Sequence, residues 1–468
     1  MVEFRAGRQR IVLPALRLAV LTFASILMAS TAYGQAQQVV EAETVLLEEV
    51  IVTARKVQES VQEIPMSVQI LSGSYLEEAD ITHVYELQFN IPGLVVNTLG
   101  MYGAGFALRG ITSGVATHLD GVYLGLSNLA ITRLFDLERV EVLKGPQGTL
   151  YGRNATGGSM NFITRPPQDE FSSRVEAAYG SFNTIRGEGF VNIPFKKSAM
   201  RLAFIGSEGD GYISNTVDNR KFAESDFWGV RGSWLINPTD RLQIDIMAQY
   251  VKDTGASGDL WLPAPAFLPD PDDIWLTTVT LANPYLVSEN SNVSINVAYD
   301  LGYATLQSVS GYAGSEVNGL DDCAGSPLMR GCVRGTNPLK YHQWSQEIRI
   351  VSKSDASFDW IAGLYYFASD RSDRHRLSVP RFGPVPLKNS FNTSEISAYA
   401  AFGQASLQMA ERWSLTGGLR LSYENNRETE IGTGQDDSKT LAVVEDDWSR
   451  PSWLINLEYA VNERMLIY

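Results

Sequence analysis

Polar and apolar side chains alternate along most of the chain from about Phe171 onward. Trp413–Glu424 has the sequence WSLTGGLRLSYE, in which Trp, Leu, Gly, Leu, Leu and Tyr alternate with Ser, Thr, Gly, Arg, Ser and Glu. Leu242–Tyr250 (LQIDIMAQY) alternates in the same way. Weaker alternation occurs in 182–195, 199–212, 225–236, 290–300, 303–315, 342–352, 358–370, 394–408 and 448–460. Successive side chains of a β-strand point to opposite faces. This region is therefore predicted to be β-sheet with one apolar and one polar face.

The connections between these segments alternate between short and long, except that the first connection on the long-loop side, near Gly180–Asn183, is short. The short ones are 194–199, 237–240, 300–302, 353–357, 409–411 and 461–463, and the long ones are 213–224, 253–289, 316–341, 371–393 and 427–447. A soluble β-sandwich would also alternate, but it has no reason to collect its long loops on one side. Aromatic residues also lie near strand ends, such as Trp413 and Tyr423. Together these features predict a transmembrane antiparallel β-barrel.

The first 34 residues have the pattern of a secretory signal peptide. Three arginines lie within the first ten residues, and Leu18–Ala29 is an apolar run. Ala32 and Gly34 then provide the small residues of a cleavage site. No later stretch approaches the ~20 apolar residues of a membrane helix. The mature protein is therefore expected to be exported, and any insertion into a membrane is expected to use strands.

Composition and motifs exclude two classes of function. The formal net charge of −15 argues against a nucleic-acid binder, which usually carries a basic face. The histidines are scattered, and the sequence contains no HExxH or GxSxG motif. The four histidines are His83, His118, His342 and His375. We therefore expect no enzyme, no catalytic residues, no metal site and no cofactor.

The number of strands raises a question about the extent of the chain. The alternating segments amount to about twelve strands, and residues 464–468 begin a thirteenth. Single-chain bacterial barrels have an even number of strands, and an unclosed sheet in lipid leaves backbone groups unpaired. We therefore expect the sequence to be the N-terminal part of a longer chain, with the barrel incomplete at its C-terminus.

Residues 48–167 have a different character. Ser74–Glu77 (SYLE) is predicted to be a capping box that opens a short helix. Short strands are predicted around 105–111, 119–124, 138–144 and 159–164. Because long apolar runs are few, this region is expected to fold as a compact mixed α/β domain and not as membrane strands.

The stretch Val140–Pro166 (VEVLKGPQGTLYGRNATGGSMNFITRP) is rich in glycine. A phosphate-binding loop would need a lysine after its glycines or a helix following them. Here Lys144 precedes the glycines, and Met160–Thr164 is strand-like. We therefore expect these glycines to serve tight turns with positive φ and close backbone contacts.

Several motifs resemble the plug domain of TonB-dependent outer-membrane receptors. They are LEEVIVTAR (47–55), IPGL (91–94), LRGI (108–111), DGVY (120–123) and FDLERVEVLKGPQGTLYGRNATGGSMNFITRPP (135–167), and they occur in the family's order. WSQEIR (344–349) and GGLR (417–420) look like the family's barrel strands. The resemblance implies a mainly β protein, in which a transmembrane β-barrel is filled by a small N-terminal α/β plug. The implied division is a signal peptide over 1–34, a periplasmic tether over 35–56, a plug over 57–167 and a barrel over 168–468.

The resemblance also identifies a TonB box in the tether. Its residues are Glu49, Val50, Ile51, Val52, Thr53 and Ala54. The stretch is rich in β-branched residues, which suits strand addition to the sheet edge of a partner. The implied partner is TonB with its inner-membrane energising complex, because the outer membrane has no nucleotides and no sustained ion gradient. An ordinary first strand of the plug is the alternative interpretation.

The function implied by the resemblance is active import across the outer membrane of a Gram-negative bacterium. Contact with outer-membrane lipid and lipopolysaccharide comes with that location. An iron chelate such as a ferric siderophore is the family's commonest cargo and is expected here by analogy. The alternatives are a non-iron nutrient, such as a carbohydrate, cobalamin or a small hydrophobic compound, and a surface receptor that signals without transport. A passive porin is disfavoured because it would have neither plug nor tether.

Tyr102 and His118 are the candidate ligand contacts, because they lie in or near predicted apical loops of the plug. A structural role for His118 is the alternative. Alternation puts Glu347 and Glu424 on polar strand faces. We predict that Arg109 and Lys144 of the plug meet these barrel carboxylates, with solvated charges that lack plug partners as the alternative.

Cys323 and Cys332 are the only cysteines of the chain. Their spacing is neither a zinc motif nor a CxxC redox motif. An exported protein meets oxidising conditions, so we expect the two to form a disulfide in a long external loop. Such a bridge would be worth roughly 2–3 kcal/mol through the entropy of the unfolded chain.

Overall fold

The computed structural model describes residues 51–52, 56, 59–60, 66–98, 104–112, 114–126, 133–254, 276–277, 285–321, 333–353, 357–378, 388–433, 439–462 and 465–468. The chain divides into two compact units, Met1–Glu49 and Val50–Tyr468. The first unit, which includes the predicted signal peptide, lies outside the described residues. Tyr102, Cys323 and Cys332 also lie outside them. All that follows concerns the second unit.

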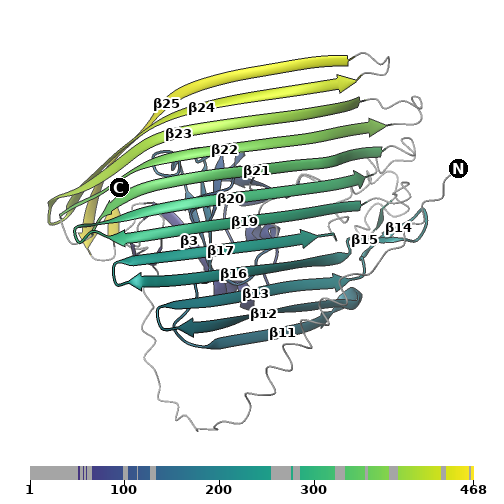
Figure 1. Cartoon of the computed structure of the whole chain (residues 1–468), viewed down its shortest axis with the longest axis horizontal. Coiled ribbons are helices and arrows are strands. Elements are labelled where there is room, and N and C mark those ends of the chain that lie inside the picture. Colours follow the sequence, from purple (N-terminus) through teal and green to yellow (C-terminus); the bar gives the residue numbers. More distant parts are fainter. Residues whose placement is uncertain are drawn as a thin grey trace, which may run out of the picture. The chain divides into compact units, whose positions relative to one another are not determined.

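A single antiparallel sheet of thirteen strands dominates this unit (Figure 1). Its strands are β11 (Ser172–Gly180), β12 (Thr184–Phe195), β13 (Ser198–Gly209), β16 (Ser225–Thr239), β17 (Leu242–Asp253), β19 (Tyr285–Asp300), β20 (Ala304–Asp321), β21 (Val333–Ser352), β22 (Phe358–Ser378), β23 (Lys388–Ala410), β24 (Trp413–Thr433), β25 (Lys439–Asn462) and β26 (Met465–Ile467). They follow one another in the sheet in chain order. The mainly β fold class predicted from alternation is therefore confirmed.

Strands β21 to β25 are longer than the alternation predicted. They contain 20 to 24 residues each, whereas a tilted strand crosses a bilayer core in roughly 9–11 residues. Much of the predicted loops 371–393 and 427–447 is strand, because β22 runs to Ser378 and β25 begins at Lys439. Backbone pairing therefore continues where the alternation fades.

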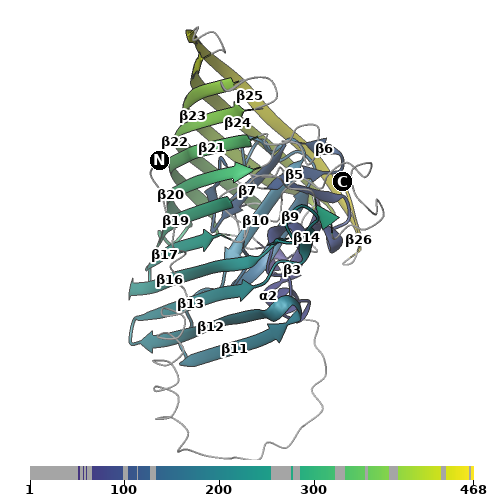
Figure 2. The same ribbon diagram turned by 90° about the vertical axis from the view of Figure 1, so that its right-hand side faces the viewer.

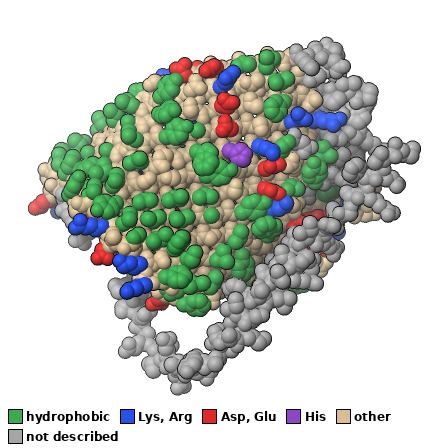
Figure 3. All heavy atoms as spheres, viewed as in Figure 1, with side chains coloured by type: hydrophobic (Ala, Val, Ile, Leu, Met, Phe, Trp, Pro, Cys, Tyr) green, Lys and Arg blue, Asp and Glu red, His purple; other side chains and the backbone are tan. Residues whose placement is uncertain are grey.

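The two faces of the sheet differ as the alternation predicted. On β24, Leu419 and Leu421 are exposed on one face, whereas Arg420 and Glu424 are buried on the other. Figure 3 shows hydrophobic side chains spread over the outward face. Ring pairs on neighbouring strands lie on this face, with Trp413 and Tyr459 at a centroid distance of 4.7 Å. The apolar face is thus outside and the polar face inside, the reverse of a soluble protein.

A small domain, here called the plug region (residues 66–164), lies against the inner face, and the sheet curves round it (Figure 2). Its elements are β3 (Ser67–Ser72), α2 (Gly73–Glu78), the 3-10 helix η2 (Val84–Phe89), β4 (Leu94–Thr98), β5 (Ala104–Leu108), β6 (Ile111–Thr112), β7 (Val115–Leu119), β8 (Val122–Tyr123), β9 (Leu137–Lys144) and β10 (Gly158–Thr164). One sheet has the order β3-β9-β10-β7-β8 and another the order β4-β5-β6. The main core packs under the first sheet around residues such as Leu87, Val140 and Phe162.

Short elements complete the described unit. They are β1 (Ile51–Val52), β2 (Glu59–Ser60), η4 (Ser181–Asn183), β14 (Ile213–Asn215), β15 (Lys221–Phe222) and β18 (Leu276–Thr277). β1 and β2 pair with each other, and β14 lies between β15 and β18 in a further small sheet. None of the helices in the described part of the chain has the length and apolar content needed to cross a membrane.

The predicted capping box at Ser74 is wrong by two residues. Helix α2 already begins at Gly73, and the Oγ of Ser72 accepts a hydrogen bond from Tyr75 N at 3.2 Å. A capping box is found instead at η2. There the Nδ1 of His83 accepts from Tyr85 N, and the carboxylate of Glu86 accepts from His83 N at 2.9 Å. An imidazole in the cap position is unusual, since Ser, Thr, Asp and Asn dominate there.

The glycine-rich stretch has the backbone geometry that the sequence predicted. Gly145, Gly152 and Gly158 have φ values of 106°, 74° and 148°. A Cβ at Gly158 would overlap the carbonyl oxygen of Leu143 and lie 2.7 Å from a methyl carbon of Leu108. These glycines therefore permit turns and close approach of β9 to β10, and the strand-like β10 follows them where a phosphate loop would have a helix.

We expect Gly158→Ala to destabilise the plug region, since it adds both strain at positive φ, of order 1–3 kcal/mol, and a steric overlap. Hydrogen exchange of the β9 and β10 amides as a function of urea would measure the change. Gly417→Ala is the matched control, because a Cβ at Gly417 has no atom within 4 Å. Equal urea midpoints for the two variants would contradict the expectation.

Candidate functional site

Buried ion pairs join the plug region to the inner face of the large sheet. On strand β13, Arg201 binds Asp136 of the plug region through two hydrogen bonds of 2.8 and 2.5 Å. The two side chains are only 2% and 8% exposed. The guanidinium also lies 3.6 Å from the centroid of the Phe190 ring. A paired guanidinium that is stacked on a ring and held by two hydrogen bonds is the arrangement in which arginine tolerates burial.

Two further arginines act near the same segment. Arg231 of β16 donates to the carbonyl oxygens of Phe135 and Asp136 at 2.8 and 3.0 Å. Arg133 of the plug region binds Asp253 at the end of β17, with distances of 2.9 and 2.6 Å. The chain between Arg133 and Asp136 is therefore held from three neighbouring regions of the sheet.

Backbone groups of the plug region are bound by Gln343 of β21. Its Oε1 accepts from Gly125 N at 2.7 Å, and its Nε2 donates to Tyr123 O at 2.5 Å. Gln343 is fully buried. These bonds satisfy a loop that would otherwise bury free polar groups.

A second group of charges lies where the plug region meets β21 to β24. Arg153 Nε is 2.9 Å from Glu424 Oε2. Lys56 Nζ lies 2.8 and 2.6 Å from the two carboxylate oxygens of Glu347, and Arg349 Nη1 lies 2.8 Å from the same carboxylate. Both carboxylates therefore face the interior, as alternation predicted, and each is paired with a cation that belongs to the tether or the plug region.

The predicted cations are not the ones that the structure brings to these carboxylates. Arg109 is exposed in the turn after β5, at a φ of 51°. Lys144 donates to Gln69 Oε1 at 3.0 Å, because the pairing of β9 with β3 holds it beside that strand. The places predicted for them at Glu347 and Glu424 are taken by Lys56 and Arg153. The prediction that Arg109 and Lys144 bind these carboxylates is therefore wrong, whereas the predicted positions of Glu347 and Glu424 are those that the structure has.

His118 lies inside the plug region and not on an apical surface. It is 5% exposed on β7, and its ring lies 5.0 Å from that of Tyr151 and 5.6 Å from that of Tyr123. Burial lowers its pKa to about 3, and the nearby ammonium of Lys56 adds to this effect. A neutral, enclosed imidazole contributes to packing in this state. The position of His118 therefore supports a structural role and not a contact with the ligand.

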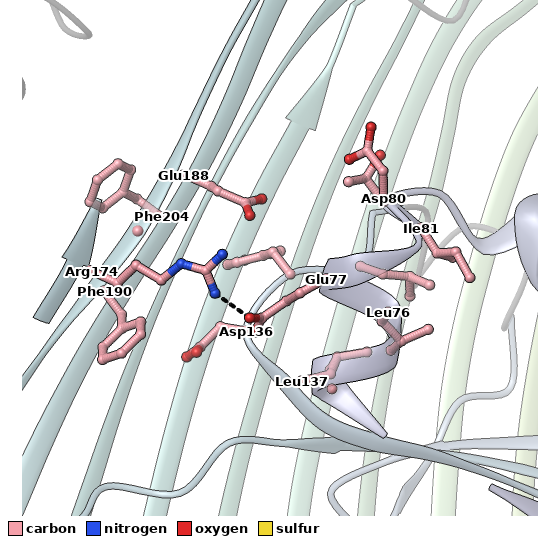
Figure 4. A pocket seen from close by; sticks show the side chains of 15 residues that line it. Leu76, Glu77, Asp80, Ile81, Asp136, Leu137, Arg174, Glu188, Phe190 and Phe204 are labelled. Atoms are coloured by element: carbon pink, nitrogen blue, oxygen red, sulfur yellow. Dashed lines mark hydrogen bonds and ion pairs between the residues drawn. The ribbon is translucent and has the colours of Figure 1, made fainter. Parts of the chain in front are cut away.

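A looser contact lies between α2 and strands β11 to β13. A cavity of about 50 Å³ opens there, lined among others by Leu76, Asp136, Glu188 and Phe204. In Figure 4, Glu77 of α2 and Arg174 of β11 meet across this space. Both partners are partly exposed, so this pair is expected to contribute little. The plug region is therefore held firmly near β13 to β17 and weakly near α2.

Comparison with family models decides the assignment. The TonB-dependent receptor plug domain matches residues 60–159, and the TonB dependent receptor-like β-barrel matches residues 228–468, more than half of the chain. The protein is a TonB-dependent receptor. Its fold is accordingly a plug within a β-barrel, and it is a protein of the outer membrane.

Curated relatives of this receptor are themselves receptors and transporters. The pesticin receptor of Yersinia enterocolitica is 23% identical over 382 residues, which cover 77% of this chain and 53% of the relative. The ferrioxamine B receptor of Salmonella typhimurium is 30% identical over 217 residues, 43% of this chain and 29% of the relative. A vitamin B12 transporter of Vibrio vulnificus is 26% identical over 229 residues, 44% and 36%. The chain thus spans about half the length of the pesticin receptor.

Solved structures share the fold. The ferric yersiniabactin uptake receptor of Yersinia pestis superimposes with a TM-score of 0.77 at 19% identity, covering 85% of this chain and 62% of that one. The open form of the ferric-catecholate import receptor of E. coli K12 gives a TM-score of 0.71 at 15% identity, covering 86% and 69%. At these identities the likeness concerns the fold alone.

Sequence reasoning missed most of the charges that hold the plug. Arg201 and Arg231 alternate with apolar residues along β13 and β16. A charged residue in such an alternating strand predicts a side chain that points to the inside of the barrel. Asp136, Arg153 and Lys56 gave no such signal. They lie in turns or in the tether, where sequence periodicity does not predict the direction in which a side chain points.

We expect Asp136→Asn to loosen the plug, because it leaves Arg201 buried without a counter-charge, which typically costs about 3–5 kcal/mol. The measurement is the urea concentration at which the β9 and β10 amides lose protection from hydrogen exchange. Asp300→Asn serves as control, since Asp300 pairs with Lys353 at an exposed turn. A midpoint for Asp136→Asn as high as that of the control would contradict the role of this pair.

Proposed function

We propose that this receptor imports a scarce ligand across the outer membrane and that TonB drives the import by pulling on the tether. The observation that carries the proposal is the plug itself, a compact domain held on the inner face of the barrel by ion pairs and by shared apolar clusters. Such ion pairs can be broken and remade. TonB would bind the box at 49–54 by strand addition, as its β-branched sequence suggests.

The described part of the box supports an extended partner-binding segment. Ile51 and Val52 form β1 and pair with Ser60 and Glu59 of β2. The other four residues lie outside the described residues, as does the predicted disulfide of Cys323 and Cys332, which stays a prediction. We keep the division into signal peptide (1–34), tether (35–56), plug (57–167) and barrel (168–468) as part of the proposal, with lipid and lipopolysaccharide around the outward face.

An iron chelate such as a ferric siderophore is our proposed ligand. Relatives named as ferrioxamine B and ferric yersiniabactin receptors support this class. The inner face near the far end of β22 is also suitably polar. There Asp373 binds Arg371 at 3.0 Å, His375 at 2.5 Å and Asn392 at 3.0 Å. Groups of this kind can hydrogen-bond to the oxygen-rich surface of an iron chelate.

A non-iron nutrient is the second candidate. A vitamin B12 transporter is among the relatives and matches 44% of this chain. Cobalamin and ferric chelates both carry many polar groups, so a polar inner wall is compatible with either ligand. The two candidates differ in regulation, because only an iron importer should be needed under iron limitation.

Deletion of residues 49–54 is expected to abolish energised uptake while leaving ligand binding to whole cells intact. The assay is uptake of a panel of radiolabelled ferric chelates and of cobalamin, with and without a protonophore. Deletion of residues 36–41 is the matched control, since it shortens the tether equally but retains the box. Unchanged uptake after deletion of 49–54 would refute TonB coupling, and cobalamin uptake without chelate uptake would refute the iron assignment.

A further inference from the structure

The inner face of strands β22 to β25 continues beyond the contact with the plug region. Arg153 of the plug region binds Glu424 of β24. Asn426, Glu428 and Glu430 follow on the same face of that strand, because side chains alternate along it. Glu428 and Glu430 are exposed, so their carboxylates are open to the space inside the barrel.

The neighbouring strands add another carboxylate and several neutral polar groups to this face. Asp446 of β25 is the direct partner of Asn426, so it points to the same side of the sheet, and it is exposed. The Nδ2 of Asn426 donates to Glu428 Oε1 at 3.2 Å, and Ser394 Oγ of β23 donates to Asn426 Oδ1 at 3.4 Å. Amide, hydroxyl and carboxylate groups are therefore mixed on one accessible surface.

The charges of this surface do not balance. Asp373 of β22 is bound by Arg371 at 3.0 Å. Glu428 and Asp446, in contrast, form no ion pair with a lysine or arginine in the described part of the chain. Among the described side chains on this face beyond Glu424 there are four carboxylates and one guanidinium group, besides one histidine. The surface is therefore acidic.

The other guanidinium groups of the same strands point outward. Arg427 follows Tyr423 by four residues on the outward face of β24, and it is exposed. Arg374 and Arg376 of β22 are exposed as well. The guanidinium carbon of Arg374 lies 6.0 Å from the centroid of the outward Phe391 ring. These cations lie across the sheet from the inner carboxylates and do not pair with them.

A buried hydroxyl group on the same face indicates that a bound molecule completes it. Ser390 of β23 lies beside Asn392 on the inner face, opposite His375 of β22. Its side chain is 1% exposed, and its Oγ has no hydrogen-bond partner in the described part of the chain. Buried polar groups are nearly always hydrogen-bonded. A ligand with polar groups could provide the missing partner.

We propose that this surface, here called the acidic wall (Asp373, Glu428, Glu430 and Asp446), selects ligands by charge and favours a ferric chelate with a free ammonium group over an anionic chelate. The inference rests on the proposed function and names the class of chelate. Carboxylates form strong hydrogen bonds with an ammonium group. A recess lined by charges of one sign also attracts the opposite charge from a distance. An anionic chelate would meet like charges at the same place.

Equilibrium binding to the full-length receptor in de-energised outer membranes tests the proposal. The probes are ferrioxamine B, which carries a free ammonium group, its N-acetyl derivative, which has the same iron centre without that charge, and an anionic iron tricatecholate. Ferrioxamine B should bind about tenfold more tightly than the N-acetyl derivative, because a few exposed contacts each change the affinity by a small factor. The tricatecholate should bind least tightly. At roughly 1 M salt the Debye length is about 3 Å, so most of the preference should disappear.

A triple variant, Glu428→Gln, Glu430→Gln and Asp446→Asn, removes the exposed carboxylates of the acidic wall. It should lower the affinity for ferrioxamine B by about tenfold and leave the affinity for the N-acetyl derivative within about twofold of the parent value. Heat-modifiable migration on gels would show that the variant is folded.

The matched control is the triple variant Asp370→Asn, Glu395→Gln and Glu445→Gln. It removes the same number of exposed carboxylates from the outward face of the same strands. Asp370 and Glu395 are direct partners on that face, each four residues from a tyrosine, Tyr366 and Tyr399. This control changes the net charge equally, so it should leave the affinity for ferrioxamine B within about twofold of the parent value.

Four results would each overturn the proposal. They are equal affinity for ferrioxamine B and its N-acetyl derivative, tighter binding of the tricatecholate, no binding of ferrioxamine B, and equal effects of the two triple variants.

Binding needs neither TonB nor energy, so the two proposals can fail separately. If ferrioxamine B is preferred but its uptake is independent of residues 49–54, the acidic wall stands and the proposed function is wrong. If uptake depends on residues 49–54 but the anionic chelate is preferred, the proposed function stands and the charge preference is wrong.

Discussion

The polar inner face of the large sheet is the constraint on which this structure depends. A barrel in lipid exposes its apolar face, so its polar side chains collect inside, and several of them are charged and buried. Arg201, Arg231 and Glu424 are each less than about a tenth exposed. Such groups require partners, and the plug provides them with carboxylates, guanidinium groups and backbone carbonyls. The plug is thus bound through polar contacts, which are directional and can be exchanged, together with apolar clusters such as the one that joins Tyr123 and Tyr151 to Phe367 and Phe402.

The strength of these contacts is unevenly distributed. Near β13 to β17 the segment around Asp136 is held by bidentate and backbone hydrogen bonds between buried groups. Near α2 the contact between Glu77 and Arg174 is partly exposed and lies beside a small cavity. Between them, the contacts at Glu347 and Glu424 involve one tether residue and one plug residue. An arrangement of this kind allows part of the plug to move while another part stays anchored.

The amount that the sequence could predict follows from the physics of each element. Alternation has a strict geometric cause, so it gave the faces of Glu347 and Glu424 and the approximate number of strands. The extent of β22 and β25 was underestimated because pairing continues beyond the membrane, where the outward residues need not be apolar. The ion pairs between plug and barrel involve residues in turns, such as Arg153. Side-chain directions in a turn follow no sequence period, so these pairs could not be predicted from alternation. For the same reason Lys56 could not be assigned from its neighbours in the chain.

Strands β21 to β25 are long enough to extend beyond the membrane. At about 3.3 Å per residue, a strand of 21 residues measures roughly 70 Å, and a tilt near 45° leaves about 50 Å along the membrane normal, some 20 Å more than the hydrocarbon core. The ordered strands therefore extend beyond the hydrocarbon core of the bilayer. A bacteriophage, bacteriocin or antibody that binds there meets stiff, hydrogen-bonded strands as well as the connections between them.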